Sequence, residues 1–201
     1  MKVIVTDVKH FTSKLFSFRT TRPQSFRFSA GQFTLLGLST CSVNRPYSMA
    51  SGPYDDFLEF YSIKVPDGLL TSKLQNIQVG DEVEINDKPS GTLTLAHLEL
   101  GGNLWLVATG TGIAPFISLF RDPSIYDEFQ RVIVIHSVRE IDDLAYDSFL
   151  AEQEIFYYPI VTRDKLYPRN KRITKSVYDE DIFNNLGLTP WKCDNDKVML
   201  C

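Results

Sequence analysis

Hydrophobic and polar residues alternate in short segments along the first half of the chain. Such segments are typical of β-strands with one buried face, and turn residues such as Gly52 and Gly91 separate them. We therefore predict an antiparallel barrel or sandwich from Met1 to about Leu98, in which only "DGLLTSKLQNI" favours a short helix. The predicted strands are "KVIVTDV" (2–8), "KLFSFRT" (14–20), "QFTLLGL" (32–38), "FLEFYSIKV" (57–65), "DEVEIN" (81–86) and "TLTL" (92–95).

The pattern changes after the glycine pair at 101–102. The runs 104–108, 132–138 and 155–161 are almost continuously apolar, which is typical of strands buried on both faces of a parallel sheet. A helix with one apolar face is predicted between the first two runs, from Ile113, Phe116, Ile117 and Phe120. We therefore predict two domains, an antiparallel β-barrel over 1–98 and an α/β domain with a parallel sheet over 103–201.

The last residues, "KVMLC", form another apolar, strand-like run. A parallel sheet rarely ends its chain on a new apolar strand with nothing to cover it. We therefore expect that the second domain is truncated at its C-terminus.

Composition narrows the possible functions. Lys and Arg total 21 and Asp and Glu total 25, so the net charge of −4 does not favour a broad nucleic-acid surface. The charged N-terminus resembles neither a signal peptide nor a membrane span, and no later apolar run is long enough to be one, so we expect a cytoplasmic protein without membrane contact. Three widely spaced cysteines disfavour a metal site or iron–sulfur cluster. Redox chemistry would need an organic cofactor.

The segment "ATGTGIAP" (108–115) lies between a predicted buried strand and a predicted helix. Glycines there let backbone N–H groups approach a pyrophosphate, and the start of a helix favours negative charge. Pro115 is compatible with the first turn of that helix. An ordinary strand-to-helix connection explains the same residues, so the segment alone leaves both interpretations open.

Basic residues follow the next two apolar runs. Arg139 stands in "HSVRE" and Arg163 in "VTRDK", and "YPRNKR" adds Arg169, Lys171 and Arg172. Guanidinium groups bind phosphate through paired hydrogen bonds, so this edge of the sheet suits a ribose 2′-phosphate. Solvated polar loops are the alternative for each residue taken singly.

The segment "NRPYSMAS" (44–51) carries a second candidate site. If it is a strand, Arg45 and Tyr47 share one face and Ser48 takes the other. An arginine beside an aromatic ring can bind a phosphate while the ring stacks on a flat heterocycle. A plain pair of residues on the barrel wall is the alternative.

The R-x-Y-S string resembles the flavin-binding motif of the ferredoxin–NADP(+) reductase family, and "GTGIAP" resembles the NADP pyrophosphate loop of that family. The two motifs occur in the family's order and on the corresponding kinds of domain. The bacterial ferredoxin/flavodoxin–NADP(+) reductase branch is also similar at "AGQFT", "EFYSIKVPDGLLTSKL", "GDEVEI" and "VMLC". The resemblance covers essentially all 201 residues and implies a barrel that binds FAD and an α/β domain that binds NADP(H).

The resemblance implies a role for each residue on the flavin side. Arg45 would bind the FAD pyrophosphate, Tyr47 would stack on the flavin and ribityl region, and Ser48 would hydrogen-bond near flavin N5. Gly68 and Thr71 match the turn and short helix that hold the FAD phosphates.

The resemblance also implies the dinucleotide side. The pyrophosphate and nicotinamide would lie along Thr109, Gly110, Thr111 and Gly112, and the 2′-phosphate would lie on Arg139, Arg163 and Arg172. Arg169 and Lys171 compete with Arg172 for that role. Cys201 would point toward the nicotinamide, so Tyr47, Ser48 and Cys201 are the expected catalytic residues.

The implied activity is hydride transfer between NADPH and FAD, followed by single-electron transfer to ferredoxin or flavodoxin. No side chain need act as a nucleophile, so His10, His97 and His136 are interpreted as structural or surface residues. We expect a monomer. Family members continue beyond the residues that match Cys201, which leaves the competence of this chain open. The alternatives are an NAD(P)H-dependent flavin or oxygenase reductase component and a non-catalytic flavin-binding module.

Overall fold

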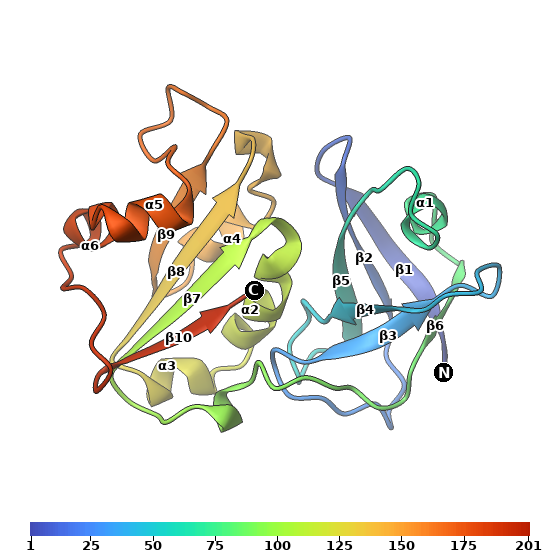
Figure 1. Cartoon of the computed structure of the whole chain (residues 1–201). Coiled ribbons are helices and arrows are strands. Elements are labelled where there is room, and N and C mark those ends of the chain that lie inside the picture. Colours follow the sequence, from blue (N-terminus) through green and yellow to red (C-terminus); the bar gives the residue numbers. More distant parts are fainter. The chain divides into compact units, whose positions relative to one another are not determined.

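The computed structural model describes residues 1–201 and divides into two compact units (Figure 1). The first unit comprises residues 1–97 and 114–122, and the second comprises residues 98–113 and 123–201. Each unit has its own sheet, and each is described by itself. None of the helices is both long enough and apolar enough to cross a membrane.

The first unit contains a six-stranded antiparallel sheet in the order β4-β3-β6-β1-β2-β5. A pairing between Met49 and Phe60 joins the two outermost strands, β4 and β5, so the sheet closes as a barrel. The predicted antiparallel barrel is confirmed. The strands are β1 (Lys2–His10), β2 (Leu15–Thr21), β3 (Phe33–Gly37), β4 (Arg45–Ser48), β5 (Phe57–Ile63) and β6 (Glu82–Ile85).

The inward-facing apolar residues of the alternating strands fill the barrel. Val3 and Val5 of β1 are buried, whereas Lys2 and Ile4 between and before them are exposed. Aromatic rings occupy much of the interior, and the ring centroids of Phe18 and Phe60 lie 5.3 Å apart. The core also contains Phe16, Phe26, Leu36, Met49, Leu58, Val83 and Ile85.

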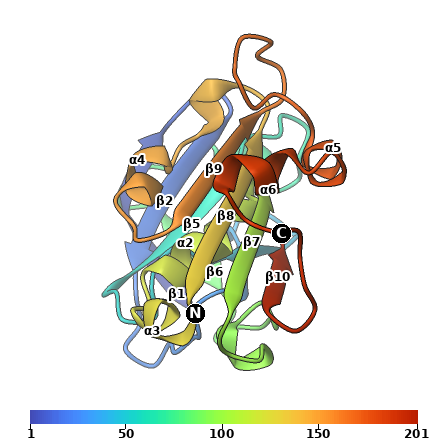
Figure 2. The same cartoon turned by 90° about the vertical axis from the view of Figure 1, so that its left-hand side faces the viewer.

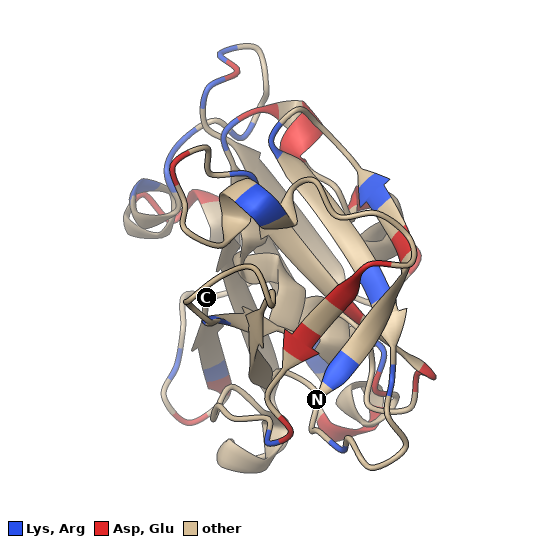
Figure 3. Ribbon diagram, turned by 90° about the vertical axis from the view of Figure 1, so that its right-hand side faces the viewer, with Lys and Arg blue, Asp and Glu red and all other residues tan.

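Charged residues of both signs are interspersed over the outer strands of this unit (Figure 3). Lys2 on β1 and Glu82 on β6, for example, form an exposed ion pair across the sheet at 2.6 Å. Such exposed pairs contribute little to stability, about 0–1 kcal/mol. The outer barrel face therefore carries mixed charge rather than charge of one sign (Figure 3).

Two predictions for this half need correction. "TLTL" (92–95) is not a strand, because β4 and β5 already close the barrel and no free strand edge remains for it. Its last residue instead opens a 3₁₀ turn, η1 (Leu95–His97), in which the Thr94 hydroxyl and His97 Nδ1 are 2.8 Å apart. The helix predicted in 67–77 is confirmed but spans only α1 (Thr71–Leu74).

The second unit contains a four-stranded parallel sheet in the order β10-β7-β8-β9 (Figure 2). Its strands are β7 (Asn103–Thr109), β8 (Arg131–Val138), β9 (Phe156–Val161) and β10 (Asp196–Leu200). β7 and β8 are buried along almost their whole length, which explains their continuously apolar sequences. The predicted α/β class is confirmed, and the terminal "KVML" run is indeed a strand.

Short helices and turns connect these strands. They are the turns η2 (Gly110–Ile113) and η3 (Ile141–Asp143) and the helices α3 (Ser124–Glu128), α4 (Asp147–Ala151), α5 (Ile173–Tyr178) and α6 (Asp181–Leu186). α5 and α6 pack on the sheet around Trp105. The ring centroids of Trp105 and Phe183 lie 5.5 Å apart, and Trp105 Nε1 donates to Asp196 Oδ1 at 2.8 Å.

Helix α2 (Ala114–Phe120) is part of the first unit, although it follows a strand of the second. The predicted helix is confirmed, but the prediction that only one face is buried is wrong, because all seven residues of α2 are buried. Ser118 is accommodated because its hydroxyl donates to the Ser51 carbonyl at 2.6 Å.

Candidate cofactor-binding site

Strand β4 carries the predicted flavin residues. It pairs with β3, which places Arg45 opposite Leu36 and Tyr47 opposite Thr34. The segment is therefore a strand, as the expected alternation of Arg45, Tyr47 and Ser48 requires. Arg45 is exposed, and only its Nη1 bonds within the protein, to the Asn44 carbonyl at 3.2 Å. Most of this guanidinium remains available to an anionic ligand.

Tyr47 is fixed more firmly than Arg45. Its hydroxyl lies 3.1 Å from Ser62 Oγ on β5. Its ring contacts the Phe60 ring edge-on, with 6.4 Å between the ring centroids. Burial raises the pKa of Tyr47, so the phenol is neutral at physiological pH. Ser48 beside it is half-buried, and no protein group hydrogen-bonds its hydroxyl. The pair thus combines an immobilised ring with an available hydroxyl.

The turn before α1 forms a tight backbone cradle. The Gly68 N–H donates to the Val65 carbonyl at 3.0 Å, and the Thr71 hydroxyl donates to the same oxygen at 3.2 Å. A Cβ at Gly68 would lie 2.0 Å from Thr71 Oγ1, so the turn needs glycine there. Because the Thr71 hydroxyl donates its only proton to the Val65 carbonyl, donation to a phosphate would require the hydroxyl to rotate.

A pocket of about 440 Å³ lies beside this turn. The Lys73 ammonium donates to the Thr40 carbonyl at its rim. Polar and small side chains dominate its wall, which is formed by residues 40–43, 66–69, Ser72 and Lys73. A pocket that combines a lysine ammonium with a glycine turn fits the phosphate portion of a nucleotide.

In the second unit, the predicted pyrophosphate loop follows β7 and forms η2. Gly110 has φ +52°, and a Cβ added there would meet nothing within 4 Å. The left-handed backbone and the open space beside it suit the close approach of a phosphate. These observations fit the dinucleotide that the resemblance implies.

Gly112 faces the opposite situation. A Cβ there would lie 2.7 Å from the backbone carbon and oxygen of Cys201 and 3.3 Å from its Sγ. The Thr109 N–H donates to the Cys201 carbonyl at 2.9 Å, and the Cys201 N–H donates to Val107 at 2.9 Å. Three predicted residues, Thr109, Gly112 and Cys201, therefore lie together. Burial raises the pKa of the Cys201 thiol, which keeps it protonated.

Sequence reasoning missed the contact that His136 makes with this loop. The residue is 1% exposed on β8, and its Nε2 lies 2.9 Å from the Gly110 carbonyl. Burial lowers the pKa of His136 to about 4, so at neutral pH the single ring proton sits on Nε2 and is donated to Gly110. Its Nδ1 is buried without a partner. Only the strand register, which pairs Ala108 with His136, reveals this contact.

The predicted arginines occupy the carboxyl edge of the same sheet. Arg139 follows β8 and Arg163 follows β9, and the Arg163 N–H donates to the Arg139 carbonyl at 3.0 Å. Both side chains are exposed, and Arg163 Nη1 lies 3.9 Å from Glu140 Oε1. The two residues are thus neighbours with little internal pairing.

The structure also separates the three cations that compete at 169–172. Lys171 donates to the carboxylates of Asp179 and Asp181, and the Arg169 guanidinium lies 4.9 Å from the centre of the Tyr158 ring. Arg172 is exposed just before α5, with no such partner. Of the three, Arg172 has the guanidinium most available to a phosphate.

Known proteins with sequences similar to this chain bear on which family it belongs to. A family model described as an oxidoreductase FAD-binding domain matches residues 3–94. A flavodoxin/ferredoxin–NADP reductase of Rhodobacter capsulatus is 43% identical over 98% of this chain and 78% of its own length. A ferredoxin–NADP reductase of Azotobacter vinelandii is 41% identical, over 98% of this chain and 82% of its own.

The solved structures that are similar to this chain include one with a high structural similarity over its whole length. It is the crystal structure of a ferredoxin NADP(+) reductase from Neisseria gonorrhoeae with bound FAD and NADP. The TM-score is 0.93 and the identity 32%, covering 100% of this chain and 84% of that one.

Proposed function

The chain belongs to the ferredoxin/flavodoxin–NADP reductase family, and we propose that it is a flavoenzyme that transfers electrons between NADP(H) and ferredoxin through FAD. The bound cofactors supply the redox chemistry, a hydride exchanged between nicotinamide and flavin and single electrons exchanged with the protein partner. This chain contributes binding, orientation and exclusion of water.

The observation that carries this proposal is the loop after β7. Gly110 offers an open, left-handed backbone, and Gly112 is packed against Cys201 so closely that no side chain fits. The Gly110 carbonyl is held by His136, and the Thr109 N–H is held by the Cys201 carbonyl, so the start of the loop is fixed on both sides. A glycine loop fixed in this way suits a pyrophosphate.

Selectivity for NADP(H) over NAD(H) is assigned to the arginines at the carboxyl edge. Arg139 and Arg163 are adjacent, and Arg172 has no carboxylate partner, unlike Lys171. Guanidinium groups form charge-assisted hydrogen bonds with a 2′-phosphate, which NAD(H) lacks. The order of preference expected is therefore NADPH before NADH.

On the flavin side, Arg45 is assigned to the FAD pyrophosphate, with the Gly68–Thr71 turn and its pocket as a second phosphate contact. Tyr47, immobilised by Ser62 and Phe60, would present its ring to the cofactor. The Ser48 hydroxyl would hold a proton near flavin N5, and Cys201 would border the nicotinamide. No side chain need exchange protons with bulk water during hydride transfer.

The partner class follows from the relatives, whose names specify ferredoxin or flavodoxin. We propose that flavodoxin is a second acceptor and that the enzyme acts as a monomer. Because this partner chemistry is separate from the NADP(H) half-reaction, the two are tested separately.

An anaerobic absorption spectrum of the purified protein tests the central proposal. Flavin absorbance that bleaches with NADPH, and only slowly with NADH, is the expected result. A protein with bound flavin that NADPH leaves oxidised would instead be a flavin-binding module, and equal bleaching by both donors would remove the arginines' role. Cytochrome c reduction that depends on added ferredoxin or flavodoxin tests the acceptors.

A further inference from the structure

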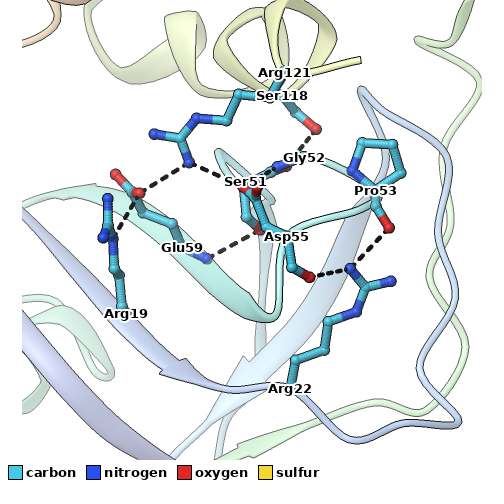
Figure 4. A network of polar contacts seen from close by, with 9 residues as sticks. All are labelled: Arg19, Arg22, Ser51, Gly52, Pro53, Asp55, Glu59, Ser118 and Arg121. Atoms are coloured by element: carbon cyan, nitrogen blue, oxygen red, sulfur yellow. Dashed lines mark hydrogen bonds and ion pairs between the residues drawn. The ribbon is translucent and has the colours of Figure 1, made fainter. Parts of the chain in front are cut away.

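A buried carboxylate, Glu59 on β5, joins two arginines from distant parts of the chain (Figure 4). Its Oε2 accepts from Arg19 Nε and from Arg121 Nη1, each at 3.1 Å. The Glu59 side chain is 5% exposed and that of Arg121 is 17% exposed. A carboxylate so removed from water is costly to leave unpaired, so both arginines are held firmly.

Further contacts fix the backbone around Arg121, which follows the last residue of α2. The Ser118 hydroxyl, one turn earlier, donates to the Ser51 carbonyl, while Ser51 Oγ accepts from the Glu59 N–H at 3.1 Å. A Cβ at Gly52 would lie 2.7 Å from Arg121 Cβ and 3.0 Å from the Arg121 carbonyl oxygen. The end of α2 therefore touches the backbone at 51–52 with no room for a side chain.

This attachment bears on the dinucleotide loop because the loop continues into α2 without a linker. Residues 110–113 form η2, and α2 begins at the next residue, Ala114. α2 belongs to the first unit, whereas residues 109–113 belong to the second. A helix of seven residues is rigid and about 10 Å long, so fixing one end constrains the other.

We propose that Arg121 is a positioning residue for the dinucleotide loop: by binding Glu59 it fixes the end of α2, and the loop at 109–112, which runs directly into α2, depends on that attachment for its conformation. The inference rests on the proposed function, because the loop is taken to hold NADP(H). Arg121 Nη1 already binds Glu59, so its expected effect is on the geometry of the loop rather than on affinity. Small misalignments of reacting groups are expensive, up to about 100-fold in rate for about 1 Å.

Arg19 supplies a matched control. It donates to the same Oε2 at the same distance, but it lies on β2, within the barrel. Loss of Arg19 removes one cation from Glu59 and leaves α2 attached. A merely structural role for the cluster would make the two arginines alike, whereas a positioning role separates them.

The experiment compares Arg121→Met with Arg19→Met in the FAD-loaded protein. Stopped-flow reduction by NADPH should slow about 10-fold or more in Arg121→Met and less than about 2-fold in Arg19→Met. Affinity for 2′-phospho-AMP, which needs no alignment with flavin, should change less than about 2-fold in both. Arg121→Lys, which keeps the charge, should recover part of the rate.

Amide hydrogen exchange gives a readout independent of activity. Exchange at residues 110–117 should accelerate about 10-fold in Arg121→Met and remain unchanged in Arg19→Met, because only the former loosens α2. Equal exchange and equal rates in the two variants would overturn the proposal. A wild-type protein whose flavin NADPH cannot reduce would refute the proposed function instead, and exchange would still decide whether Arg121 positions the loop.

Discussion

The two parts of the proposed dinucleotide site are built in opposite ways. The loop at 109–112 is held by folded neighbours, since the buried His136 binds the Gly110 carbonyl and the backbone of Cys201 packs against Gly112. Arg139 and Arg163, at the carboxyl edge of the same sheet, are exposed and almost unpaired. Backbone groups that bind a ligand must be positioned by folding. Long exposed side chains can instead adopt their binding conformation when the ligand arrives. Substitutions in the loop should therefore disturb both fold and rate, and arginine substitutions should change selectivity alone.

The largest effect is expected for Gly112→Ala. Its Cβ would approach the Cys201 backbone to 2.7 Å, so the loop or the end of β10 must move. Stopped-flow reduction of the flavin by NADPH should fall about 100-fold. Gly110→Ala is the control, because open space surrounds that position and only its left-handed backbone is strained, at about 1 kcal/mol. Equal losses in the two variants would show that Cys201 contact is not what holds the loop.

The next effect concerns His136 and pH. Burial lowers the pKa of His136 to about 4, whereas in the unfolded chain the side chain titrates near the ordinary histidine value of 6.5. Between these values the unfolded state binds a proton that the folded state does not, so stability falls as pH falls from about 7 to about 4. The nearby carboxylates of Asp143 and Asp147 oppose this shift and do not cancel it.

The loss attributable to His136 should reach about 3 kcal/mol at pH 4. Denaturant unfolding of wild type and His136→Asn at several pH values isolates this contribution, because carboxylates elsewhere titrate in both proteins. Parallel pH profiles for the two proteins would contradict the burial of a neutral imidazole behind the loop.

A smaller effect is expected for the exposed arginines. Arg139→Ala and Arg163→Ala should each raise KM for NADPH about 10-fold, the value of one charge-assisted hydrogen bond, and leave KM for NADH unchanged. Their unfolding free energies should change by less than about 0.5 kcal/mol, since both side chains are exposed. Lys171→Ala is the matched control, because that cation is already engaged by Asp179 and Asp181. A Lys171→Ala variant with a larger loss of NADPH selectivity would reassign the phosphate contact.

The smallest effect tests the flavin side, where Tyr47 is placed by folding as the loop is. Tyr47→Phe removes the hydroxyl contact with Ser62 and keeps the ring. The unfolding free energy should fall by about 1 kcal/mol, with FAD content unchanged. Ser62→Ala should not add to that loss in the double variant. Loss of FAD from Tyr47→Phe would mean that the hydroxyl itself binds the cofactor.

Much of the fold was predictable because it follows from local rules. Alternating residues marked five of the strands of the barrel half, and unbroken apolar runs marked β7, β8 and β9. The rules failed at "TLTL", where the pattern suits a strand but the closed barrel has no edge to pair with it. They also understated the burial of α2, since periodicity counts apolar residues and Ser118 is buried by a hydrogen bond. Strand edges and hydrogen-bond partners are properties of the assembled chain.

The sequence by itself determined the two kinds of sheet, the order of the two cofactor motifs and the positions of the arginines after the strands. Only the tertiary structure decided that His136 lies behind Gly110, that Gly112 meets Cys201, and that Arg121 shares Glu59 with Arg19. It also decided which cation among Arg169, Lys171 and Arg172 stays available. The reason is range: alternation and turn chemistry act over a few neighbouring residues, whereas register and charge pairing join residues 26 to 89 positions apart.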